Sequence, residues 1–182
     1  MGSALDNTIT NTQSHDNQYG LRLSSAANNT ITNTQSYNND QYGIRLEYAS
    51  ENTITNTQSY NNQYGFRLGY SSNNTIDNAQ SYNNTQHGIY LEYSSNNNTI
   101  NNVQSYNNSA KGIRFNNQSD NNTINNSQMY NNLSAGFVVT QSSNNTINNS
   151  QIYNNSNVGL FLYSSANDNK ISNTFSYNNG SV

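Results

Sequence analysis

The tripeptide Asn-Thr-Ile, or a close variant of it, returns every 22 to 24 residues along the chain, and this repeat limits the possible folds more than any other feature. Eight isoleucines mark it: Ile9, Ile31, Ile54, Ile76, Ile100, Ile124, Ile147 and Ile171. Because 44 of the 182 residues are Asn and only 8 % are charged, composition alone would suggest a disordered chain. A disordered chain has no reason to keep phase over eight units, so the repeat predicts a solenoid.

Within each unit, a glycine is followed by apolar residues two positions apart, as in Ile44 and Leu46 or Phe66 and Leu68. This period of two is typical of a β-strand with one buried face. The other segments are short and rich in Asn, Thr and Ser, which disfavours helices. Three short strands and three corners per unit predict an all-β, single-stranded parallel β-helix (a solenoid) of about eight coils, spanning residues 1–182 as one domain. Residues 1–5 are interpreted as an added tag or an irregular lead-in.

Stacking of coils would turn each repeat position into a column of identical side chains. Because a carboxamide can donate to and accept from the same group one coil away, one invariant column predicts a structural Asn ladder: Asn29, Asn52, Asn74, Asn98, Asn122 and Asn145. An outward-facing column predicts a surface ladder of stacked rings, which would also offer a flat platform for sugar rings: Tyr37, Tyr60, Tyr82, Tyr106, Tyr130 and Tyr153.

The unit resembles the right-handed parallel β-helix repeats of carbohydrate-binding and sugar-hydrolase proteins, of NosD-type periplasmic proteins and of archaeal surface proteins. Residues 43–46 (Gly-Ile-Arg-Leu), 60–62 (Tyr-Asn-Asn) and 71–76 (Ser-Ser-Asn-Asn-Thr-Ile) carry the likeness, which extends over nearly the whole chain. The resemblance implies a right-handed coil and an extracellular or cell-surface location. The copper handling linked to NosD-type proteins is not carried over, because His15 and His87 are scattered.

Composition argues against several classes of function. The chain has no Cys, and its formal net charge is −3 with six Lys and Arg, which disfavours a thiolate metal site and nucleic-acid binding. No apolar run approaches the ~20 residues of a membrane-spanning helix. We therefore expect no metal, no cofactor, no nucleic-acid partner and no membrane span.

The candidate binding surface is a face on which arginines and tyrosines recur. Like charges one coil apart repel each other unless an anion compensates them, so this face could contact an acidic glycan or a neighbouring subunit. Its predicted members are Arg22, Arg45, Arg67, Tyr42, Tyr64, Tyr48, Tyr70 and Tyr93.

Catalysis and ice binding are weaker interpretations of the same repeats. Glu47 and Glu92 are the one aligned acidic pair, two coils apart, and a surface lattice of ion pairs with the arginines explains them as well as a glycosidase site does. Rows of Thr beside the repeat isoleucine resemble an ice-binding array, but they decay after Thr53 and Thr55.

The sequence therefore predicts a non-catalytic structural rod of an extracellular filament or cell-surface layer, with no enzymatic activity. Its uncapped ends suggest self-association from head to tail. The alternatives left open are a glycan-binding module that uses the Arg/Tyr face, an ice-binding protein and a glycoside-cleaving enzyme.

Overall fold

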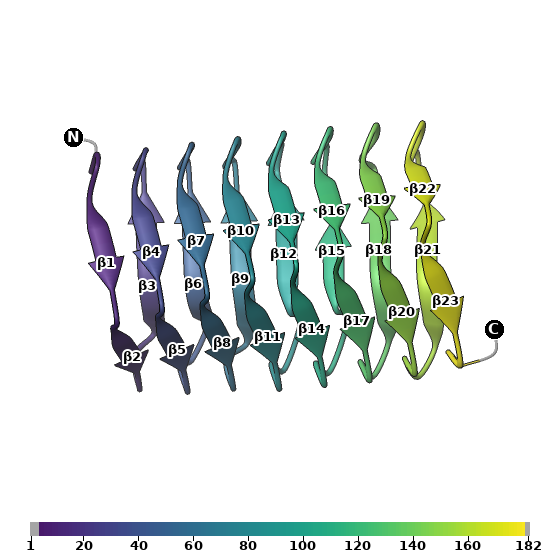
Figure 1. Ribbon diagram of the computed structural model, residues 1–182, viewed down its shortest axis with the longest axis horizontal. Helices are drawn as coiled ribbons and strands as arrows, with labels where there is room; N and C mark the ends of the chain where they lie inside the picture. Colours follow the sequence, from purple (N-terminus) through teal and green to yellow (C-terminus); the bar gives the residue numbers. More distant parts are fainter. Residues whose placement is uncertain (1–3, 181–182) are drawn as a thin grey trace.

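The computed structural model describes residues 4–180, and the part of the interpreted lead-in formed by residues 1–3 lies outside them. The described chain forms a parallel β-helix in which 23 short strands stack into three sheets (Figure 1). Two sheets have eight strands and the third has seven, so the chain makes seven full coils and two strands of an eighth, where the sequence predicts about eight coils. The predicted all-β parallel solenoid is confirmed.

The first sheet begins each coil at the Asn-Thr-Ile motif. Its strands are β1 (Thr8–Thr10), β4 (Thr30–Thr32), β7 (Thr53–Thr55), β10 (Thr75–Asp77), β13 (Thr99–Asn101), β16 (Thr123–Asn125), β19 (Thr146–Asn148) and β22 (Lys170–Ser172). The second sheet follows after one corner. Its strands are β2 (Gln13–His15), β5 (Gln35–Tyr37), β8 (Gln58–Tyr60), β11 (Gln80–Tyr82), β14 (Gln104–Tyr106), β17 (Gln128–Tyr130), β20 (Gln151–Tyr153) and β23 (Phe175–Tyr177).

The third sheet closes the coil and lies behind the first sheet in Figure 1. Its strands are β3 (Tyr19–Ser24), β6 (Tyr42–Glu47), β9 (Tyr64–Gly69), β12 (Ile89–Glu92), β15 (Ile113–Phe115), β18 (Ala135–Thr140) and β21 (Val158–Tyr163). No described residue belongs to a helix of the length and apolarity that crossing a membrane would need.

The core is built from identical positions of successive coils. In the first sheet Ile54 pairs in register with Ile31 and Ile76, and all three side chains are buried. The third sheet adds inward residues two apart, such as Phe66 and Leu68 on β9. Since one coil cannot bury its apolar face alone, this register shares one continuous core along the helix axis.

A buried serine of the second sheet explains why each repeat has a glycine at the start of its third strand. The buried Ser59 hydroxyl donates to the carbonyl oxygen of Gly65 over 2.8 Å, and a Cβ atom added to Gly43 would overlap that hydroxyl. The serine of one coil thus fills the space left by the glycine of the coil before it, so the glycine is required by close approach.

The Asn columns play two different roles. In the buried ladder, the Oδ1 atom of Asn52 accepts from the backbone N–H and the Nδ2 of Asn29, over 3.0 and 2.9 Å. A second buried ladder repeats this geometry, with Asn62 accepting both bonds from Asn39. A third column lies exposed at corners with left-handed backbone, as at Asn56 (φ 52°), a conformation that Asn tolerates well.

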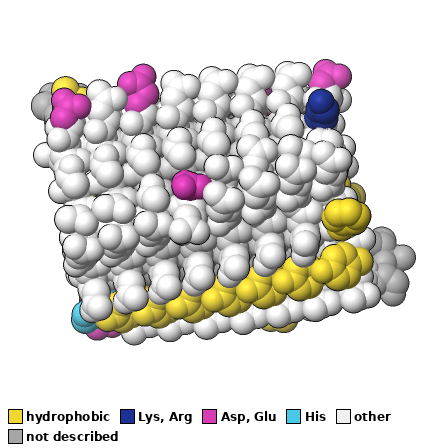
Figure 2. Space-filling view, viewed as in Figure 1, with side chains coloured by type: hydrophobic (Ala, Val, Ile, Leu, Met, Phe, Trp, Pro, Cys, Tyr) yellow, Lys and Arg dark blue, Asp and Glu magenta, His cyan; other side chains and the backbone are white. Residues whose placement is uncertain are grey.

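The outer surface of the second sheet carries the tyrosine ladder. From Tyr37 to Tyr177 the ring centroids of neighbouring coils lie 4.8–5.2 Å apart and the ring planes differ by 3–7°. It forms the continuous yellow row in Figure 2, on a face with few charged side chains. Because each ring covers the face of its neighbour, the row presents mainly ring edges to solvent.

Candidate functional site

Charged and aromatic side chains gather on the outer surface of the third sheet, which we call the third-sheet face. Strand alternation sends the arginine and carboxylate positions outward, two residues apart, and the ring position, three residues before the arginine, is also partly exposed, so coil stacking makes three columns. The ring column holds Tyr19, Tyr42, Tyr64 and His87. The arginine column holds Arg22, Arg45, Arg67, Tyr90, Arg114, Val138 and Phe161. The carboxylate column holds Ser24, Glu47, Gly69, Glu92, Asn116, Thr140 and Tyr163.

Cations and rings interleave in the first three coils. The guanidinium carbon of Arg45 lies 5.6 Å from the ring centroid of Tyr19 and 5.1 Å from that of Tyr42. Arg67 lies 5.2 Å from the ring centroid of Tyr42. These distances allow cation–π attraction, which orients the guanidinium groups along the face.

Two glutamates compensate these arginines. Glu47 accepts from Arg22 Nη2 over 2.7 Å and from Arg45 Nη2, and Glu92 accepts from Arg67 Nε over 2.7 Å. Burial raises the pKa of the Glu47 carboxyl, but the hydrogen bond from Arg22 and the charge of Arg45 outweigh burial, so the pKa lies below its ordinary value. Glu47 and Glu92 are therefore held by separate arginines rather than poised as a catalytic pair.

His87 interrupts the ring column in the fourth coil. Its ring packs edge-on against Tyr64 and Tyr90, with centroids 5.7 and 5.1 Å apart, and its Nδ1 accepts from the backbone N–H of Lys111 over 3.3 Å. The residue is 5 % exposed. Burial lowers the pKa of His87 to about 3, and the positive charges of Lys111 and Arg114 act in the same direction. The imidazole is neutral at neutral pH.

Tyr90 interrupts the arginine column beside His87. Its hydroxyl accepts from Asn116 Nδ2 over 3.1 Å, and the guanidinium carbon of Arg114 lies 5.4 Å from its ring centroid. Burial and the neighbouring Glu92 carboxylate raise the pKa of the Tyr90 hydroxyl far above its ordinary value. The Tyr90 hydroxyl therefore stays protonated next to a neutral imidazole.

The predicted Arg/Tyr face divides into two groups. Arg22, Arg45 and Arg67 lie with Tyr42 and Tyr64 on the third-sheet face, where the rings of Tyr42 and Tyr64 stack 5.4 Å apart. The other predicted tyrosines form a separate stack at the following corner, with ring centroids 4.8 and 5.2 Å apart and exposures of 59, 47 and 40 %: Tyr48, Tyr70 and Tyr93.

Four residues of this face escaped the sequence-based reasoning: His87, Tyr90, Lys111 and Arg114. For His87 and Tyr90 the signal was a departure from the repeat, whereas Arg114 continues the arginine column. His87 stands where other coils have Tyr, and Tyr90 stands where other coils have Arg. Departures of this kind mark positions where a side chain does something other than continue the stack.

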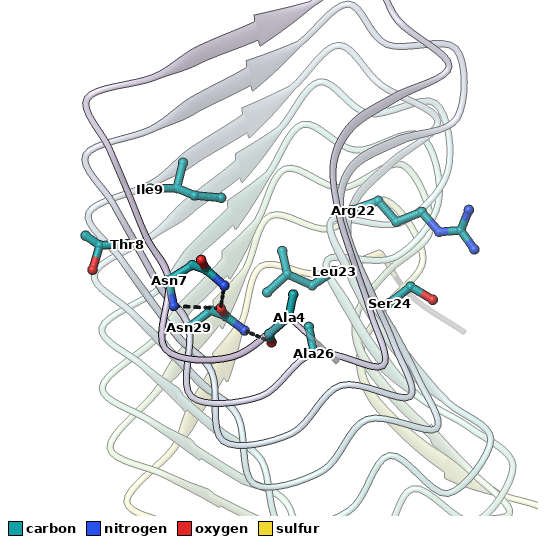
Figure 3. A pocket seen from close by; sticks show the side chains of 9 residues that line it. All are labelled: Ala4, Asn7, Thr8, Ile9, Arg22, Leu23, Ser24, Ala26 and Asn29. Atoms are coloured by element: carbon teal, nitrogen blue, oxygen red, sulfur yellow. Dashed lines mark hydrogen bonds between the residues drawn. The ribbon is translucent and has the colours of Figure 1, made fainter. Parts of the chain in front are cut away.

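A hollow of about 600 Å³ lies at the N-terminal end of the described helix. Figure 3 shows that Ile9, Leu23 and Ala26 line it, next to the Asn7–Asn29 hydrogen bonds. It is the exposed cross-section of the core in the first coil. A smaller hollow of about 190 Å³ lies on the third-sheet face, where Lys111, Val138 and Phe161 line it.

Metal binding would need several oxygen or nitrogen ligands close together. Within residues 4–180, no three His, Asp or Glu side chains approach one another closely enough to hold a metal ion. The groups on the third-sheet face that could engage a ligand are instead cations, tyrosine hydroxyls and one imidazole.

The repeat matches the model of the right handed beta helix region over residues 2–128 and 71–176, so the chain belongs to the right-handed β-helix family. The resemblance inferred from the sequence is confirmed. No curated protein matches the chain in sequence.

Solved structures with the same coil include several polysaccharide-active proteins. The A-module of Azotobacter vinelandii mannuronan C-5 epimerase AlgE4 has a TM-score of 0.81 and 20 % identity, over 98 % of this chain and 57 % of that one. Pectate lyase Pel9A has a TM-score of 0.62 and 17 % identity, over 86 % and 55 %. The enzymatically active domain of bacteriophage CBA120 tailspike protein 2 has a TM-score of 0.71 and 14 % identity, over 99 % and 32 %. The chain spans between a third and about three fifths of these proteins.

These matches correct two predictions. The sequence predicted a structural rod without enzymatic activity, whereas the solved structures that share the coil are an epimerase, a lyase and a tailspike with an enzymatically active domain. The rod prediction treated the scarcity of aligned carboxylates as a scarcity of chemistry. The third-sheet face carries Arg, His, Tyr and Lys side chains that this argument did not count.

Proposed function

We propose that the chain is part of an enzyme that acts on an acidic polysaccharide, and that the third-sheet face binds this substrate. The observation that carries the proposal is the register of Arg22, Arg45 and Arg67, which leads along one face to His87 and Tyr90. The similar proteins support the substrate class, because mannuronan, alginate and pectate are acidic polysaccharides.

Binding would use the cations and rings together. Arg22, Arg45 and Arg67 share the two carboxylates of Glu47 and Glu92, so the row keeps one net positive charge. Guanidinium N–H groups that the glutamates do not take can bind a substrate carboxylate, and Arg–carboxylate bonds are among the stronger hydrogen bonds in proteins. The exposed stack of Tyr48, Tyr70 and Tyr93 borders the same sheet at its corner and would contact the sugar rings.

The reaction that this face supports is proton transfer at the carbon that bears the carboxylate. Arginine pairing with the carboxylate makes this carbon more acidic. In the resting fold burial weakens His87 as a base and Tyr90 as an acid, and His87 Nδ1 is occupied by the backbone N–H of Lys111. His87 could accept the proton, and Tyr90 donate one, once this contact opens and the two side chains are less buried. Return of a proton to the opposite side of the carbon gives an epimer. Departure of the neighbouring glycosidic oxygen, which takes up a proton, gives an unsaturated sugar. Since both rings are almost covered, turnover requires the side chains around them to move.

The location that fits this function is outside the cytoplasm, where such polysaccharides occur. The similar structures include a periplasmic alginate epimerase and a phage tailspike, which supports an extracellular or surface location. Self-association through the ends of the solenoid stays a prediction from the sequence.

Affinity electrophoresis in gels that contain alginate or polygalacturonate tests the binding half of the proposal. We expect both acidic polymers to retard the protein, and neutral dextran to leave its mobility unchanged. The double variant Arg45→Gln, Arg67→Gln should lose the retardation. Lys170→Glu lowers the net charge by the same two units at an exposed position of the first sheet, away from this face, and should keep the retardation. Equal retardation of wild type and the arginine variant would overturn the assignment of this face.

A further inference from the structure

Arg114 differs from the other arginines of its column because it has no glutamate partner in the described part of the chain. Each of those arginines pairs with a glutamate two positions further on, either in its own coil (Arg45 with Glu47) or in the next coil (Arg22 with Glu47, Arg67 with Glu92). The corresponding positions for Arg114 hold Asn116 in its own coil and Thr140 in the next, because Arg114 pairs in register with Val138. Neither side chain carries a negative charge.

Arg114 and Thr140, between which such an ion pair would form, each have a polar atom without a hydrogen-bond partner in the described chain. Arg114 Nε and Thr140 Oγ1 are buried and have no hydrogen-bond partner among the described residues, and Thr140 is only 6 % exposed. A buried donor without a partner costs about 1–3 kcal/mol, and more when it is charged. Arg45 Nε also lacks a partner, but the guanidinium of Arg45 is compensated by Glu47. Arg114 has no such compensation within residues 4–180.

A second cation adds to the positive charge at this place. Burial lowers the pKa of the Lys111 ammonium, and the nearby charge of Arg114 lowers it further. Lys111 also lines the hollow of about 190 Å³ with Val138 and Phe161, the two residues that follow Arg114 in its column. Arg114 and Thr140 therefore lie beside a small hollow of mixed polarity, to which Lys111, Asn157 and Phe161 contribute and whose size suits one sugar residue rather than a large ligand.

We propose that the carboxylate of one uronate residue of the polysaccharide binds at Arg114 and Thr140, in the place that a glutamate side chain takes two coils earlier. The sugar ring lies against the exposed ring of Phe161, and Lys111 borders it. This subsite rests on the proposed function, and it specifies which sugar is held next to His87 and Tyr90. The carboxylate of the ligand supplies the negative charge that the carboxylate column lacks next to Arg114.

The test uses D-galacturonate as a small probe and follows the Arg114 Nε–H signal by NMR. We expect a saturable shift of this signal on addition of galacturonate, and no shift on addition of uncharged galactose. Thr140→Glu places the missing carboxylate in the column and should weaken galacturonate binding at least tenfold, whereas the uncharged, similarly sized Thr140→Gln should weaken it much less. Arg114→Gln, with its fold checked by circular dichroism, should abolish binding measured by calorimetry.

Several outcomes would overturn the subsite: no shift in the wild type, an equal shift with galactose, or equal binding by the Thr140→Glu and Thr140→Gln variants. The proposed function fails in a different way, through absence of turnover of the polymer. If the protein binds galacturonate at Arg114 but does not turn over the polymer, the proposed subsite stands and the proposed enzymatic activity is refuted. If the protein turns over the polymer and Thr140→Glu leaves this turnover unchanged, the proposed enzymatic activity stands and the proposed subsite is refuted.

Discussion

Arg67 and Glu92 lie on adjacent coils, and Arg67 Nε donates to Glu92 Oε1 over 2.7 Å while both side chains are largely buried. Removal of the carboxylate charge would leave the guanidinium uncompensated, so we expect Glu92→Gln to lower the free energy of unfolding by about 3–5 kcal/mol. Urea unfolding measures this loss. Glu51→Gln, at an exposed corner, is the control and should change stability by less than about 0.5 kcal/mol. A loss below 1 kcal/mol for Glu92→Gln would contradict the assigned pairing.

The pKa of His87 makes stability depend on pH. Its pKa is about 3 in the folded chain against an ordinary value of 6.5, so the unfolded chain binds an additional proton between these values. Stability from this residue is therefore fully present above about pH 6.5 and is lost as pH falls toward 3, by up to about 1.4 kcal/mol per pH unit. Urea unfolding between pH 4.5 and 6.5 should show this slope, and His87→Gln should flatten it. An NMR titration that places the pKa of His87 near 6.5 would refute the buried, neutral imidazole.

The buried Asn ladder predicts a sharp difference between two kinds of Asn. Asn74→Ala removes the Oδ1 that accepts from the backbone N–H and the Nδ2 of Asn52, over 3.0 and 2.9 Å. Because two buried donors then lack a partner, we expect a loss of about 2–4 kcal/mol in chemical unfolding. Asn125→Thr, on the outer side of β16 where earlier coils have Thr, should be neutral within about 0.5 kcal/mol. Equal effects of the two changes would show that the ladder does not stabilise the coil.

Tyr70 is held in a left-handed backbone conformation (φ 52°) with its ring 47 % exposed. That conformation costs a bulky residue about 1–2 kcal/mol, and stacking on Tyr48 and Tyr93 returns a similar amount. We therefore expect Tyr70→Asn to change the free energy of unfolding by less than about 1 kcal/mol but to weaken retardation in alginate gels several-fold. Tyr106→Asn, in the tyrosine ladder of the second sheet, should leave the retardation unchanged. Unaltered retardation of the Tyr70 variant would remove this corner from the binding surface.

The repeat was sufficient to predict the fold, since each column of the structure corresponds to one position of the sequence unit. Ile54 and Asn52 pair with their counterparts in register because identical neighbours leave no better alternative. The division of the Asn columns was not predictable in the same way. Asn both tolerates left-handed corners and makes ladder bonds, so composition alone cannot assign Asn56 to a corner and Asn62 to a ladder.

The site was predicted only where it follows the repeat. Arg45 and Tyr42 were found because they recur, whereas His87 and Tyr90 depart from their columns, and Arg114 differs from the other arginines only in lacking a glutamate partner among the described residues. The burial of His87 depends on Tyr64, Tyr90 and the Lys111 backbone on three coils, and such contacts across coils follow from the structure. The rod prediction was wrong because it weighed the regularity of the chain above these departures.

Incubation of the purified protein with mannuronan and with polygalacturonate in D₂O, followed by ¹H NMR, tests the central claim most directly. If the third-sheet face transfers the proton next to the carboxylate, signals of an epimer or of an unsaturated sugar will grow with time, and epimer formed in D₂O will carry deuterium at that carbon. His87→Gln and Tyr90→Phe should each slow this reaction by at least a hundredfold, while Tyr106→Phe leaves it unchanged. Unchanged spectra for both polymers after prolonged incubation with protein that binds them would contradict the account.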